Sequence, residues 1–191
     1  LAHADQSVHK VLPVWSHWAN ENWCMIGYHA VSVLADARAK GMSGIDWGQA
    51  IDAAIRSSTW SDYDGLGDYL STGYVPSEHG SASISKTLEY AYDDWCIAQL
   101  IAPDVPSHHQ YTGTDHPLLS LQKSYEGRSM HYKNTFNPKT GWATQRSQNG
   151  AFHQNNDLLS THGQGFIEGN AWNYSFYAPH DVNGLKEAMG G

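Results

Sequence analysis

The sequence is poor in charged residues, and in positive charge above all. Asp, Glu, Lys and Arg make up 16% of the 191 residues, and 11 Lys and Arg stand against 19 Asp and Glu, for a formal net charge of −8. Proteins that bind nucleic acid neutralise phosphates with Lys and Arg, so this balance argues against a nucleic-acid partner. No window of the sequence is apolar over the length that a membrane span needs, which argues against a membrane partner as well.

Motifs for metal or nucleotide chemistry are also lacking. There is no HExxH, no CxxC and no phosphate-binding glycine loop, so zinc hydrolysis and nucleotide chemistry have no local support. The two cysteines, Cys24 and Cys96, lie in apolar helical patterns without metal-ligand spacing. We expect two buried free thiols, and a disulfide between them in an oxidising compartment stays open.

Aromatic residues, by contrast, are abundant, with eight Trp and eleven Tyr. Together with Asn, Asp, Glu and His on an acidic background, they suit a neutral polyhydroxylated ligand such as a sugar. With 40% hydrophobic residues, the chain can build one sizeable core or form part of a larger one.

Helical periodicity dominates the chain, and strand-type alternation is almost missing. Successive buried helices joined by long loops are typical of an all-α fold, here part of an (α/α) toroid of helical hairpins. A complete toroid needs about twice as many helices, so residues 1–191 are predicted to be part of a domain. Helices are predicted over 23–40, 46–57, 118–135 and around Trp172, from Ser83 or Ser85 to the residue before Pro103, and from Asp181 to Met189, with a short turn around Tyr69.

One carboxylate falls on a buried face of the helix that starts near Ser83. Asp94 shares that face with Tyr90, Ile97 and Ile101. A buried carboxylate must be hydrogen-bonded or functional, and structural hydrogen bonding is the commoner answer.

The stretch FIEGNAWNYSFYAPH, residues 166–180, places a single carboxyl among aromatic residues. On a helix, Glu168 would share a face with Ala171, Trp172 and Ser175. An indole beside a carboxyl removes water, and desolvation raises the pKa of a carboxyl so that it donates a proton near neutral pH. The pattern makes Glu168 a candidate general acid and Trp172 a candidate substrate contact, while the local alternative is a first-turn carboxylate that interacts with the helix dipole.

Further candidate pocket residues lie near the beginning of the first long helix. Asn20, Glu21 and His29 are polar exceptions on an otherwise apolar element, and Trp15 could stack on a sugar face. The alternative is that these groups contact solvent or cap neighbouring loops. Residues 141–165 lack periodicity and are rich in Gln, Asn, His and Ser, which is typical of a binding or lid segment.

Five segments in collinear order point to one protein family. They are LPVW, NENWCMIGYHAVSVLADA, SISKTLEYAYDDWCIAQL, YKNTFNPKTG and EGNAWNYSFYAPHDVNGL. Together they resemble glycoside hydrolase family 92, the calcium-dependent exo-acting α-mannosidases. The resemblance implies an inverting mechanism on terminal α-mannosyl residues of glycans, a six-hairpin α/α catalytic domain and a secreted or periplasmic protein. It also implies that Glu168, in the EGNAW segment, is the general acid.

Other parts that the resemblance implies are missing from the sequence. The family's general base lies in a segment similar to GNEDCGQMSAW, and sugar and calcium contacts lie in one similar to GNEPSHH; neither occurs here. The N-terminal β-sandwich and the remainder of the toroid are absent too. The resemblance places Glu21, Asp93 and Asp94 as structural or pocket-lining groups rather than as the base. The isolated fragment is therefore predicted to be inactive, with calcium ligands mostly in the rest of the parent polypeptide.

Two alternatives to an α-mannosidase remain open on the sequence. One is a non-catalytic, carbohydrate-binding helical scaffold that kept the acid-bearing segment without the base. The other is an α/α-toroid glycosidase that acts on a different sugar.

Overall fold

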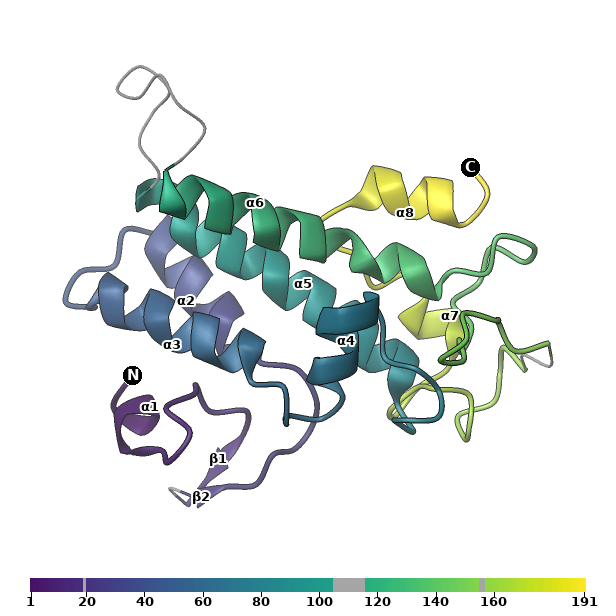
Figure 1. The fold of residues 1–191 in the computed structure, drawn as a ribbon, viewed down its shortest axis with the longest axis horizontal. Helices are drawn as coiled ribbons and strands as arrows, with labels where there is room; N and C mark the ends of the chain where they lie inside the picture. Colours follow the sequence, from purple (N-terminus) through teal and green to yellow (C-terminus); the bar gives the residue numbers. More distant parts are fainter. Residues whose placement is uncertain (19, 105–115, 155–156) are drawn as a thin grey trace. The chain divides into compact units, whose positions relative to one another are not determined.

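Helices dominate the computed structural model, which describes residues 1–18, 20–104, 116–154 and 157–191 (Figure 1). These residues form two compact units, and the long helix α5 (Ser83–Ile101) contributes to both. The first unit holds Leu1–Thr59 and Asp93–Ser129, and the second holds Trp60–Tyr92 and Met130–Gly191. The predicted helical class is confirmed, while closure into a toroid stays a prediction.

The first unit consists of a small hairpin and four longer helical segments. In the hairpin, β1 pairs antiparallel with β2, and Ser16 lies opposite Glu21. Helix α3 turns Ala50, Ile51 and Ala54 inward, as the sequence pattern predicts. The elements are α1 (Ala2–Gln6), β1 (Ser16–His17), β2 (Asn20–Glu21), α2 (Ala30–Ala39), α3 (Trp47–Thr59), the second half of α5, the 3-10 turn η1 (Ala102–Asp104) and α6 (Pro117–Ser129).

Helix α2 begins at Ala30 and not at Trp23, so the predicted start was wrong. Side chains occupy the backbone donors that would begin a helix there: the Glu21 carboxylate accepts from the Trp23 N–H, and the Asn22 side chain accepts from the Cys24 N–H. Gly27 follows with φ of +81°, which a helix cannot contain. Both cysteines are free, as expected, but Cys24 is exposed because this segment is not a buried helix.

Asp94 is fully buried and fully engaged, which confirms the structural expectation for it. The Arg128 guanidinium donates to both carboxylate oxygens, at 2.9 Å from Nε and 2.7 Å from the terminal nitrogen. The Tyr28 hydroxyl donates to the same carboxylate at 2.8 Å. This ion pair ties α6 to α5, and Figure 1 shows the two helices running alongside each other.

In the second unit, the first half of α5 packs against residues that come before and after Glu168 in the chain. Ile84, Leu88 and Ala91 form the predicted apolar stripe and join a core that includes Phe166 and Ala171. This core holds both ends of the stretch that contains Glu168. The other elements are α4 (Leu66–Thr72), the 3-10 helix η2 (Met130–Thr135), α7 (Ala171–Tyr174) and α8 (Val182–Ala188).

Helix α8 starts where the sequence predicts. The Asp181 side chain caps it by accepting from the Gly184 N–H at 2.9 Å, and it also accepts from the Tyr132 hydroxyl at 2.8 Å. The cap hydrogen bond, helped by Tyr132 and Lys133 against the effect of burial, lowers the pKa of Asp181 below its ordinary value. The described helices include none with both the length and the apolar character that a membrane crossing requires.

Candidate active site

Glu168 precedes helix α7 and is not part of it. The helix starts after Asn170, whose side chain accepts from the Trp172 N–H at 3.0 Å, while the Asn173 side chain accepts from the Asn170 N–H at 2.8 Å. This capping box fixes the start of the helix. The predicted helical face shared by Glu168, Ala171 and Trp172 was therefore wrong.

The backbone at Glu168 adopts φ of +48°, in the left-handed region that non-glycine residues seldom occupy. Such conformations cost about 1–3 kcal/mol and cluster at functional sites. The side chain is exposed. This local turn directs Glu168 away from the helix that the sequence pattern suggested.

Trp172 does not cover Glu168 as expected. Its ring packs on Trp142, with centroids 4.9 Å apart, and it remains 51% exposed. The Phe176 ring also contacts Trp142, edge to face, with 6.4 Å between the two centroids. Glu168 is exposed, so the expected burial of its carboxyl beside the Trp172 indole is not found.

Two residues that the sequence reasoning missed lie behind Glu168. The Tyr174 hydroxyl donates to Glu89 on α5 at 3.0 Å, and Glu89 is 9% exposed. Burial, with the charges of Glu89 and Glu168 adding to it, raises the pKa of Tyr174 to about 12, so the hydroxyl is a stable donor at neutral pH. The available signal was an acid, Glu89, inside the buried run of α5, which also contains Asp93 and Asp94.

Glu21 lies in the first unit and holds its own loop together. Its carboxylate accepts from three backbone N–H groups, those of Val14 at 2.7 Å, Trp15 at 3.0 Å and Trp23 at 2.9 Å. Burial alone would raise the pKa of Glu21, but these hydrogen bonds together outweigh it and hold the pKa below its ordinary value. In this chain, the contacts of Glu21 therefore stabilise the loop that contains Val14, Trp15 and Trp23.

The structure brings together three of the four candidates in the first unit. Glu21 fixes the backbone of Trp15, whose side chain is 55% exposed. Asn20 and Glu21 line a groove of about 350 Å³ beside α1. His29 lies at the start of α2, where its Nδ1 is 2.8 Å from the Oδ1 of the fully buried Asp93.

We expect replacement of Glu21 with Gln to loosen its loop. One amide nitrogen would face a backbone donor instead of accepting from it, at a cost of about 1–3 kcal/mol. Because the folded pKa of Glu21 is lowered, its stabilisation is present above the unfolded value of about 4.3 and is lost as the pH falls through the lower folded value. Protection factors for hydrogen exchange of residues 12–18 and 20–26 should be lower in Glu21→Gln at pH 7, and those of the wild type should fall toward those of the variant on acidification. Equal exchange at pH 7 would show that Glu21 does not organise the loop.

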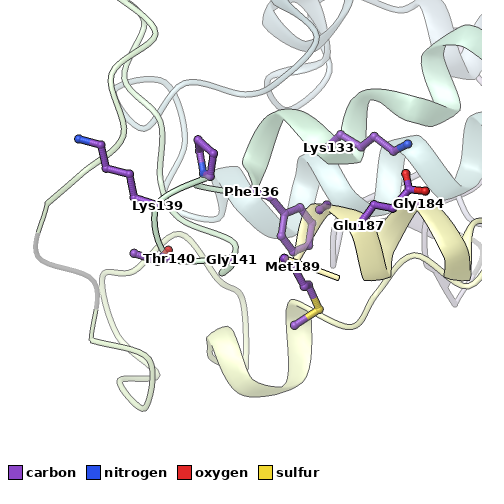
Figure 2. Close-up of a pocket in the computed structure, with 11 residues that line it drawn as sticks. Lys133, Phe136, Lys139, Thr140, Gly141, Gly184, Glu187 and Met189 are labelled. Carbon is purple, nitrogen blue, oxygen red and sulfur yellow. The ribbon is translucent and has the colours of Figure 1, made fainter.

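The second unit has a larger groove, of about 610 Å³. The predicted site residues do not line this groove. It runs between the turn at 136–141 and α8. Figure 2 shows the Phe136 ring beside Met189, with Lys133 and Glu187 toward one end.

Within the described ranges, no group of three or more His, Cys, Asp and Glu side chains is placed to hold a metal ion.

Comparisons with known proteins agree on one family. The sequence profile of the glycosyl hydrolase family 92 catalytic domain matches residues 1–191. A family GH92 alpha-mannosidase from Bacteroides thetaiotaomicron is similar in structure, with a TM-score of 0.89 and 37% identity over 99% of this chain and 24% of that chain. It has also been solved in complex with mannoimidazole. A GH92 inverting mannosidase from the same organism gives a TM-score of 0.83 and 29% identity, over 100% of this chain and 25% of that one.

A curated relative from Arthroderma benhamiae is described as an uncharacterized secreted glycosidase. It is 27% identical over an alignment of 189 positions that covers 86% of this chain and 24% of the relative. The chain thus spans about a quarter of the length of the relatives it matches.

Proposed function

The chain belongs to glycosyl hydrolase family 92, and we propose that it forms the acid-bearing part of an exo-acting, inverting α-mannosidase that removes terminal α-mannose from glycans. The observation that carries the proposal is the family match over the whole chain, together with the structural likeness to mannosidases. The N-terminal β-sandwich and the rest of the α/α toroid would come from other parts of the polypeptide.

Glu168 is the proposed general acid. An inverting glycosidase protonates the glycosidic oxygen with one carboxyl while a second carboxylate activates water on the opposite face of the sugar, about 6.5–9.5 Å away. The exposed position of Glu168 and its left-handed backbone support this role, because they present the carboxyl on a fixed turn. The base would be supplied from outside these 191 residues, as the family resemblance implies.

Trp15, Asn20, Glu21, His29 and Trp172 are the proposed substrate contacts. Trp15 and Trp172 are more than half exposed, so their rings are available to stack on a sugar. His29 is held by Asp93 through one ring nitrogen, which orients the ring. Glu21 would act through the loop that carries Trp15.

Calcium and an extracellular location are part of the same proposal. The calcium ligands would come mainly from other segments, as the family resemblance implies. Secretion is suggested by the Arthroderma relative, which is described as a secreted glycosidase.

The proposal is tested with the complete polypeptide and a panel of α-linked disaccharides. We expect release of mannose from α-mannosides, with β-mannose as the first product by NMR, loss of activity in a chelator and recovery with added Ca²⁺. Hydrolysis confined to glucosides or galactosides would favour a glycosidase for another sugar. Mannoside binding without hydrolysis would favour a non-catalytic scaffold.

A further inference from the structure

The backbone next to Glu168 is packed tightly against an aromatic ring. A methyl group on Gly169 would lie 2.9 Å from two ring carbons of Tyr174, closer than real side-chain carbons approach. Gly169 is buried although Glu168 beside it is exposed. The Tyr174 ring also contacts Phe166, with 5.7 Å between the centroids. The Tyr174 ring therefore packs against Gly169, directly after Glu168, and against Phe166, two residues before Glu168.

Tyr174 is in turn fixed from α5. Its hydroxyl donates to Glu89 Oε1 at 3.0 Å, and Glu89 is almost wholly buried on the longest helix of the described residues. One turn earlier on the same helix face, the Ser85 hydroxyl accepts from the Ile167 N–H at 3.1 Å. Helix α5 thus holds the segment before Glu168 through Ser85 and the segment after it through Glu89 and Tyr174.

Burying the Glu89 carboxylate beside Tyr174 costs free energy that a neutral hydrogen-bond acceptor would not cost. A buried charge is unfavourable unless hydrogen bonds compensate for it. Burial, followed by the charges of Glu89 and Glu168, raises the pKa of Tyr174. The hydrogen bond from Tyr174 offsets part of the cost at Glu89.

We propose that Glu89 is a positioning residue for the α-mannosidase reaction, which anchors Tyr174 so that its ring holds the Gly169 backbone and thereby fixes the direction of the Glu168 carboxyl. This inference rests on the proposed role of Glu168 as general acid. A general acid works only within hydrogen-bond reach of the leaving oxygen, and a shift of about 1 Å in such a group costs about 10²-fold in rate.

The test uses three variants of the complete enzyme: Tyr174→Phe, Glu89→Ala and Glu89→Gln. Tyr174→Phe keeps the ring on Gly169 and removes the anchor, and Glu89→Ala removes the anchor from the other side. We expect both to lower kcat on a mannosyl disaccharide by roughly 10- to 100-fold with little change in KM. Hydrolysis of dinitrophenyl mannoside, which needs no acid, should change little. Glu89→Gln keeps an acceptor for the hydroxyl and should lose less than Glu89→Ala on the disaccharide.

The matched control is Tyr90→Phe, next to Glu89 on α5, which removes a hydroxyl that donates at 2.9 Å to the backbone carbonyl of Asp64. Tyr90→Phe should lower kcat on both substrates equally or leave it unchanged on both. If Tyr174→Phe loses equally on both substrates, or matches the wild type on the disaccharide, the positioning role is overturned. Glu168→Gln, run in parallel, separates the two claims: if it shows no preference between substrates, the assignment of the acid itself fails.

Discussion

Replacement of Glu168 with Gln in the complete enzyme should reduce turnover of mannosyl disaccharides by about 10²–10⁴-fold, the range that positioned proton transfer contributes. A departing sugar is a poor leaving group and needs the proton, whereas dinitrophenolate leaves unaided. Activity on dinitrophenyl mannoside should therefore be largely kept. The alkaline limb of the pH profile should flatten, because the group that must stay protonated is gone.

The variant should leave stability almost unchanged, since Glu168 is exposed and Gln occupies nearly the same volume. Glu187→Gln, at an exposed carboxylate on α8 of the same unit, is the matched control and should retain wild-type rates. Equal losses on both substrates would make Glu168 a binding residue. An unchanged rate on the disaccharide would remove it from the site.

The spacing of residues along the sequence correctly predicted the features that depend on a single helix. The stripe of Ile84, Leu88 and Ala91 on α5 and the cap at Asp181 both appear as expected. Each depends on spacing along one helix, which the sequence displays directly. The buried, hydrogen-bonded state of Asp94 also follows from its place on an apolar face, although its partner Arg128 does not.

The errors lie where side chains compete with the backbone. Glu21 takes the N–H of Trp23, which delays α2, and Asn170 caps α7, which leaves Glu168 outside the helix. The spacing of apolar residues along a helix does not indicate which side chains accept hydrogen bonds from backbone N–H groups. Glu89 was missed for a related reason: its partner, Tyr174, lies 85 residues away in sequence. Long-range polar pairs therefore decide the details of the candidate site, while apolar spacing decides the helices.

The ion pair of Arg128 and Asp94 joins α6 to α5 within the first unit. Asp94 is 0% exposed and the Arg128 side chain is 14% exposed. Arg128 also donates to the Ser58 carbonyl at 2.9 Å and lies over the Tyr125 ring, 4.7 Å from its centroid. Its fork binds both oxygens of the carboxylate, a geometry that Lys cannot reproduce.

Replacement of Arg128 with Met should therefore destabilise the protein by about 3–5 kcal/mol, because it leaves the Asp94 charge buried and without its cation. Urea unfolding followed by Trp fluorescence measures the loss. The double variant Arg128→Met with Asp94→Asn should recover part of it, since the buried charge is then gone and the Asn carbonyl can still accept from Tyr28. Lys40→Met removes an exposed pair with Asp36 at i, i+4 spacing and should cost only about 0.3–0.5 kcal/mol. A loss at Arg128 as small as that at Lys40, or a double variant no more stable than Arg128→Met, would mean that the charge of Asp94 is solvated or neutralised in another way.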